Sequence, residues 1–119
     1  MTEEAIKEKV LKYIQTNQGF VTFAELGRAF QRWGYSYRGD RAYTKENSKN
    51  ICFWYGWSGA AFTIIAELIK ARQVYFVPAD VFAYVIDGET LNIPIAKKPY
   101  GYDVPHWFPV YLMARGENK

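Results

Sequence analysis

The sequence has very few of the residues that build disulfides and metal centres: one cysteine, Cys52, and one histidine, His106. A single cysteine excludes a disulfide within the chain. One cysteine and one histidine also exclude the common zinc sites within one chain, because these sites take four such ligands. Chains without disulfides are typical of reducing compartments, so we expect a cytoplasmic location. We also predict that the protein holds no metal and no cofactor.

The sequence lacks a long apolar run. The longest uncharged stretch covers residues 50–66 and is interrupted by Gly56, Ser58 and Gly59, whereas a membrane-spanning helix needs about 20 apolar residues. The first ten residues, MTEEAIKEKV, are charged and lack the apolar segment of a signal peptide. We therefore predict that no membrane is among the partners of this protein.

Signatures of catalysis are also missing. The glycines do not follow the spacing of a phosphate-binding loop, and the acidic residues are scattered rather than paired. A Cys52–His106 pair is the one catalytic alternative, and it is disfavoured because Cys52 lies in an apolar run, where thiols are usually inert packing groups. We predict that the protein is not an enzyme, has no catalytic residues and takes no small-molecule substrate.

Aromatic side chains, by contrast, are abundant. They make up 18% of the 119 residues, and half of all residues are hydrophobic. A chain of this length buries enough apolar surface to fold without disulfides, so we predict one domain over residues 1–119. The net charge of +3 is compatible with a nucleic-acid partner, although it is well short of a strongly basic domain.

Apolar spacing and capping residues predict three helices. The first is capped by Thr2, the second by Thr22, and the third, over about residues 59–72, by Ser58. Thr22 is followed three residues later by Glu25, which is the spacing of a capping box.

Strands are predicted mainly after the third helix. Residues 51–57 precede that helix and read as a strand that is apolar on both faces. Residues 74–77 and 81–86 read as two neighbouring strands, with Asp87-Gly88 as a tight turn after them. A last short strand is predicted over residues 110–113.

The order of helix, short strand, two capped helices and β-hairpin resembles a winged helix-turn-helix domain. The segments that carry this resemblance are Ile6 to Ile14, VTFAEL with Phe30, SGAAFTIIAELIKARQ, and VYFVPADVFAYVIDGETLNIPIA. The resemblance implies an α+β fold, with a winged-helix-like three-helix core over residues 1–96 that ends in a C-terminal β-hairpin or small antiparallel sheet. Residues 97–119 are then a Pro-rich extended tail that packs on this core.

The resemblance implies that the third helix, Ser58 to Arg72, enters the DNA major groove. This helix offers few cations, however, and its Glu67 would face phosphates. Base reading through it is therefore disfavoured.

Residues 28–49 combine cations with tyrosines. They hold six cations and two acids, a local net charge of +4, and residues 34–49 have no clear period, so we expect an irregular insertion there. Cations follow phosphates while aromatic rings stack on bases. We therefore predict a non-catalytic nucleic-acid-associated regulatory module, with DNA or RNA contacted by Arg28, Arg32, Arg38, Arg41, Lys45, Lys49, Tyr35, Tyr37 and Tyr43. The simpler interpretation is a solvated loop whose tyrosines cover the edge of the core.

The alternative function is protein–protein interaction. Strand 51–57 and helix 58–72 carry more apolar surface than a small domain readily buries, and surplus apolar surface commonly marks an association site. This alternative predicts a homodimer or a partner protein at an interface that contains Trp54, Ile64 and Leu68.

Overall fold

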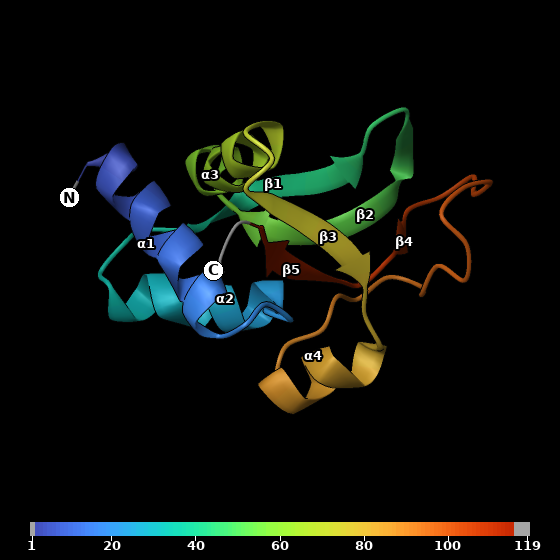
Figure 1. Ribbon diagram of the computed structural model, residues 1–119. Coiled ribbons are helices and arrows are strands. Elements are labelled where there is room, and N and C mark those ends of the chain that lie inside the picture. The colour runs from blue at the N-terminus through green and yellow to red at the C-terminus, as the bar shows by residue number, and fades with distance from the viewer. Residues whose placement is uncertain (1, 116–119) are drawn as a thin grey trace.

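Four helices and two small sheets make up residues 2–115, the part of the chain that the computed structural model describes (Figure 1). The predicted α+β class is confirmed. The elements are α1 (Glu3–Thr16), α2 (Phe23–Arg32), β1 (Arg38–Lys45), β2 (Ser48–Trp57), α3 (Gly59–Lys70), β3 (Val74–Pro78), α4 (Val81–Asp87), β4 (His106–Trp107) and β5 (Val110–Ala114).

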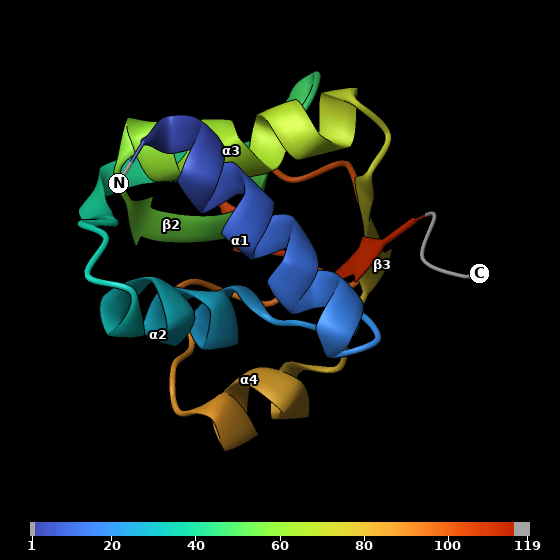
Figure 2. The ribbon, with the colours of Figure 1, turned by 60° about the vertical axis from the view of Figure 1, so that its left-hand side comes forward.

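The three predicted helices begin where their capping residues place them. The side chains of Thr2, Thr22 and Ser58 each accept a hydrogen bond from the backbone N–H three residues later, at 3.1, 2.9 and 3.1 Å. Each bond satisfies one of the N–H groups that the first turn of a helix leaves without a partner. Figure 2 shows α1 crossing from α3 towards the lower end of the molecule, beside α2.

Residues 38–57 form a β-hairpin, so the predicted irregular insertion was wrong. β1 pairs antiparallel with β2, and Lys45 lies opposite Ser48 across a two-residue turn. Asn47 in this turn has φ +65°, a left-handed conformation that asparagine tolerates better than most residues. The sequence shows no apolar alternation for β1, because β1 is the edge strand of the order β1-β2-β4 and its first five residues are exposed.

Residues 81–87 form helix α4, so the predicted strand over residues 81–86 was wrong. The side chain of Asp80 caps this helix by accepting a hydrogen bond from the Phe82 N–H at 2.9 Å. Gly88, with φ +86°, ends the helix instead of turning a hairpin. A short apolar run such as VFAYVI fits both a strand and a buried helix turn, because its periodicity does not separate the two.

β3 pairs with β5, which confirms a last strand near residues 110–113. The antiparallel register runs from Val74 opposite Ala114 to Pro78 opposite Val110. Val21 extends this sheet by an isolated antiparallel bridge to Leu112, with N–H to oxygen distances of 3.2 and 2.7 Å.

The C-terminal segment completes the core rather than packing on a finished one. β4 pairs parallel with β2, and Trp107, Val110 and Leu112 are all buried. The expected extended tail over residues 97–119 therefore includes two strands, and its residues 116–119 lie outside the described part of the chain. The winged-helix resemblance stays a prediction, without the hairpin that was expected from residues 74–86.

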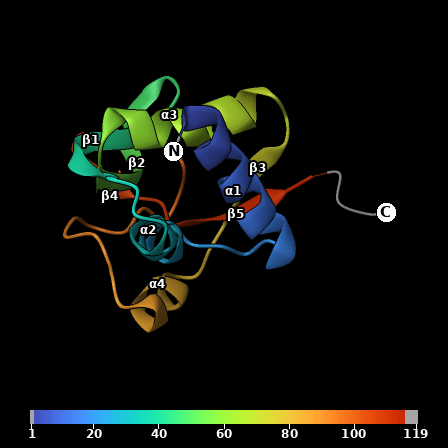
Figure 3. The ribbon, with the colours of Figure 1, turned by 90° about the vertical axis from the view of Figure 1, so that its left-hand side faces the viewer.

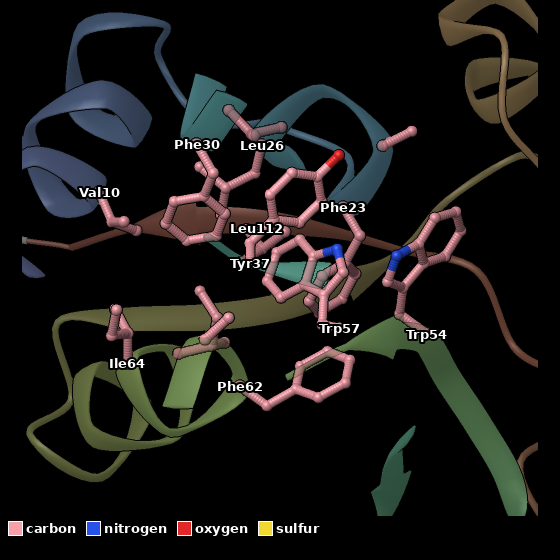
Figure 4. Close-up of a cluster of buried hydrophobic side chains, with 14 of the residues drawn as sticks. Val10, Phe23, Leu26, Phe30, Tyr37, Trp54, Trp57, Phe62, Ile64 and Leu112 are labelled. Carbon is pink, nitrogen blue, oxygen red and sulfur yellow. The ribbon is translucent and has the colours of Figure 1, made fainter. Parts of the chain in front are cut away.

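Aromatic rings from α2, β2 and α3 meet in the core (Figure 4). The ring centroid of Phe23 lies 6.0 Å from that of Trp54, 5.2 Å from Trp57 and 5.7 Å from Phe76. Trp57 in turn stacks on Phe62 at 5.0 Å, which anchors the start of α3. The aromatic run in β2 is thus mainly a core segment.

Candidate nucleic-acid interface

The nine residues predicted to contact nucleic acid do not form one surface. Arg28 and Arg32 belong to α2, whereas Lys45 and Lys49 lie on either side of the β1–β2 turn at the opposite end of the molecule (Figure 1). Arg28 donates a hydrogen bond to the backbone carbonyl of Asp87 and pairs with its carboxylate at 3.5 Å. This arginine therefore ties α4 to α2.

The three tyrosines pack against the core. Tyr37 is buried and stacks on Phe30, with 5.7 Å between ring centroids. Tyr35 is half-buried and its ring lies 5.1 Å from that of Phe30. Tyr43 packs edge-on against Phe62 at 5.6 Å. Burial raises the pKa of both Tyr35 and Tyr43. The rings of these tyrosines therefore support the interpretation that they cover the edge of the core.

Arg38 and Arg41 lie at the N-terminal end of α3. An irregularity in β1 places both of them opposite Trp57 in the strand register. The guanidinium of Arg38 lies 5.1 Å from the ring centroid of Tyr37, and Arg41 forms an exposed ion pair with Asp40 at 3.8 Å. The two arginines thus add positive charge beside the first turn of α3, which carries no acidic residue.

Lys45 and Lys49 meet a segment that sequence reasoning missed, the loop over residues 97–105. The Lys45 Nζ donates a hydrogen bond to the Pro99 carbonyl at 2.9 Å, and the Asn50 side chain donates one to the Tyr102 carbonyl at 2.9 Å. Lys49 and Tyr102 both line a hollow of about 190 Å³ between the hairpin turn and this loop. The hairpin turn and the loop are therefore one surface.

Tyr102 holds this loop in place. Its hydroxyl accepts hydrogen bonds from the backbone N–H groups of Lys97, at 2.8 Å, and Lys98, at 3.3 Å. Its ring stacks on that of His106, with 3.8 Å between centroids and 20° between planes. Since His106 begins β4, which pairs with β2, the loop is anchored to the same sheet as the hairpin.

Three lysines and one exposed tyrosine gather on this surface, which we call the hairpin-tip patch. Tyr100 is 60% exposed, and the Lys98 ammonium lies 5.4 Å from its ring centroid. With Lys97, Glu46 and Asp103 nearby in the same two segments, the local net charge is +2. The members of the patch are Lys45, Lys49, Lys98 and Tyr100. The string KKPYGY carried the signal, because it repeats the mixture of cations and tyrosines seen in residues 28–49.

The predicted protein interface is not a surface of the chain. Trp54, Ile64 and Leu68 are each 1% exposed and lie inside the core. That prediction was wrong because α1 packs on α3, and the rings of Phe23, Tyr84 and Trp107 surround Trp54. Three exposed apolar residues lie together on α4, where Phe82, Val85 and Ile86 are 67%, 53% and 81% exposed.

Cys52 is an inert packing group rather than a nucleophile. Burial raises the pKa of its thiol to about 11, so the thiol stays protonated at neutral pH. The thiol donates a weak hydrogen bond to the Trp54 carbonyl at 3.3 Å, and the His106 Nδ1 lies 2.9 Å from the Val104 carbonyl. Within residues 2–115, no three histidine, cysteine or acidic side chains gather as a metal site.

None of the helices in the described residues has the length and apolarity to cross a membrane. The chain matches no protein-family model, no curated protein sequence and no solved structure.

Proposed function

We propose that this protein is a small, non-catalytic, nucleic-acid-associated regulatory module that contacts DNA or RNA through the hairpin-tip patch. The observation that carries the proposal is the meeting of three lysines with an exposed tyrosine, contributed by two segments some 50 residues apart. Cations of this kind neutralise phosphates, and an exposed tyrosine ring offers a stacking face for a base. The proposed location is the cytoplasm, where a lone cysteine such as Cys52 stays reduced.

The ligand that fits the patch best is a single strand. Tyr100 can stack only on a base that is not already stacked within a duplex, and a tyrosine–base stack contributes about 1–3 kcal/mol. The lysines contribute without regard to sequence, because phosphate contacts carry no direct sequence information.

A winged-helix core is part of the proposal. A helix, the Val21 bridge, two capped helices and the antiparallel pair β3–β5 follow one another in the order of that family. Two insertions separate these parts: the β1–β2 hairpin between α2 and α3, and residues 79–109, which contain α4, between the paired strands. In this arrangement Arg38 and Arg41 of the hairpin lie beside the first turn of α3. They supply the positive charge that this turn itself lacks.

A salt titration tests the proposed contact. Lys49 and Lys98 are replaced together by glutamine, and Lys9 and Lys12 of α1 provide a control pair with the same change in charge. Binding of labelled 20-nucleotide single strands and duplexes is followed by fluorescence anisotropy at four salt concentrations. We expect wild type and the α1 control to bind alike, while Lys49→Gln/Lys98→Gln lowers the salt slope by about 1.4, since each phosphate contact on a single strand contributes about 0.7.

Tyr100→Ala completes this test. We expect it to weaken binding of the single strand and to leave duplex binding unchanged, because only unpaired bases stack on the ring. Equal losses in the hairpin-tip and α1 variants, or no binding by wild type at the lowest salt concentration, would refute the proposal.

The second candidate function is a dimerising adaptor that associates through α4. It is favoured by the exposed apolar face of Phe82, Val85 and Ile86, which stand three and four residues apart on one side of the helix. Figure 3 shows α4 beneath α2, on the side away from α3, so this face is well separated from the hairpin tip. Sedimentation equilibrium at rising concentration, compared with Ile86→Lys, tests it: a wild-type monomer throughout would exclude the dimer.

A further inference from the structure

A second basic surface lies where α3 passes into β3, away from the hairpin tip. A hollow of about 390 Å³ opens there, with two arginines and a tyrosine around an aliphatic floor. The lining residues are Ile69, Arg72, Val74, Tyr75 and Arg115. In Figure 2, the turn after α3 and the end of β5 lie on the same side of the molecule, next to β3.

The backbone holds the two arginines close together. Val74 pairs with Ala114 in the register of β3 and β5, and the Arg115 N–H donates a hydrogen bond to the Gln73 carbonyl at 2.9 Å. Arg115 thus lies opposite the residue that follows Arg72. Its guanidinium lies 4.5 Å from the ring centroid of Tyr75, which fixes its direction.

Arg72 occupies a backbone position that favours glycine. The Arg72 N–H donates to the Ile69 carbonyl and the Gln73 N–H donates to the Leu68 carbonyl, both at 2.9 Å. This pair of bonds is the Schellman ending of a helix, in which Arg72 takes the left-handed conformation with φ +61°. A glycine would adopt this conformation without steric strain, so the backbone does not explain the arginine.

Neither arginine is neutralised by a carboxylate within residues 2–115: the salt bridges found there involve Lys7, Arg28 and Arg41 only. Two guanidinium groups beside one hollow therefore leave a concentrated positive charge. A guanidinium presents a planar fork of N–H donors that matches the oxygens of a phosphoryl group, so that two of them can share one phosphate.

We propose that Arg72 and Arg115 form a binding site for a phosphoryl group, carried either by a small phosphorylated compound or by the backbone of a nucleic acid. Arg115, held by the Tyr75 ring, supplies one fixed fork of donors. Arg72, which lines the same hollow, supplies the second. This site is separate from the hairpin-tip patch and does not depend on it.

Arg72→Gly separates binding from stability. Glycine relieves the left-handed strain, so the variant is expected to unfold at a higher urea concentration than wild type while its phosphate affinity falls at least tenfold. A loss of binding by misfolding would lower the urea midpoint instead. The matched control is Lys70→Gln, which removes one positive charge from the end of α3 without removing a residue that lines the hollow.

Calorimetric titration at constant ionic strength is carried out with three probes: inorganic phosphate, adenosine monophosphate and a 10-nucleotide single strand. A small phosphorylated ligand is supported if inorganic phosphate and adenosine monophosphate bind, and if this binding is weakened by Arg72→Gly and by Arg115→Gln but not by Lys70→Gln. Binding of the oligonucleotide alone, with the same dependence on both arginines, supports a nucleic-acid backbone. Lys49→Gln/Lys98→Gln is expected to bind inorganic phosphate as wild type does. The phosphate site and the hairpin-tip patch are therefore tested independently of each other. The phosphate site is overturned if no probe binds, or if Arg72→Gly binds every probe with wild-type affinity.

Discussion

The two ends of the β1–β2 hairpin are built from the same strands and have opposite characters. At its base, Tyr37, Trp54 and Trp57 are buried among the rings of the core. At its tip, Lys45 and Lys49 flank a two-residue turn and meet the loop that carries Tyr100. One hairpin thus anchors the fold at one end and offers a charged surface at the other. Stability and binding are therefore expected to respond to different substitutions.

The largest expected effect is at the base. Trp54→Ala removes a ring that is 1% exposed and stacks on Phe23, so we expect a loss of about 3–5 kcal/mol in the free energy of unfolding. Urea denaturation measures it. A loss below about 1 kcal/mol would mean that the base of the hairpin does not anchor the core.

Gly39→Ala tests how closely the base approaches α3. An added Cβ would lie 2.6 Å from the Ser58 Cα and 2.9 Å from the Trp57 carbonyl oxygen, so the backbone must shift. We expect a loss of about 1–3 kcal/mol in the free energy of unfolding, as for other overpacked positions. The matched control is Gly59→Ala, where the added methyl meets only the Arg41 Cγ at 3.9 Å. If both variants unfold alike, the close approach is not a constraint.

Cys52, in the middle of β2 and opposite Thr44, gives the stability of the hairpin a dependence on pH. Burial raises the pKa of its folded-state thiol to about 11, whereas the unfolded thiol ionises near pH 9. Unfolding therefore releases a proton above pH 9, and the thiol's contribution to stability falls as the pH rises from 9 through 11. Between pH 8 and pH 10, the free energy of unfolding, measured by urea denaturation, should fall by about 1 kcal/mol more for wild type than for Cys52→Ala. Parallel pH curves for the two proteins would contradict the burial of the thiol.

The smallest expected change in stability is at the tip. Lys49→Gln/Lys98→Gln alters two exposed side chains, so we expect a change within about 0.5 kcal/mol in the free energy of unfolding. The same protein is expected to lose salt-dependent binding of single strands. A large loss of stability in this variant would remove the contrast between base and tip.

Local signals predicted the parts of the fold that depend on neighbouring residues. Thr22 and Ser58 cap helices because their side chains bond to an N–H three residues away, and that spacing can be read directly from the sequence. The strand at β5 was also predicted, but its partner was not. Val74 and Ala114 pair across 40 positions, and no local pattern in the sequence encodes such a distance.

The candidate interface was predicted only in part for the same reason. Lys45 and Lys49 were identified from the cations around them, whereas Lys98 and Tyr100 join them through a bond between Lys45 and the Pro99 carbonyl. Tyr37 was assigned to the surface because it stands between polar residues, yet the edge strand that follows it turns its ring onto Phe30. Exposure of an aromatic ring depends on what packs against it, and for Tyr37 this includes the ring of Trp57, which belongs to the other strand of the hairpin.

The bridge between Val21 and Leu112 has a consequence for co-translational folding. α2 and α3 are translated long before β5, so Val21 lacks its bridge to Leu112, and β3 lacks its partner strand, until residues 110–114 are made. Such long-range strand pairing slows folding and leaves aggregation-prone intermediates during synthesis. We expect nascent chains that stop before residue 110 to be captured by chaperones, and release of the full-length chain to end that dependence abruptly.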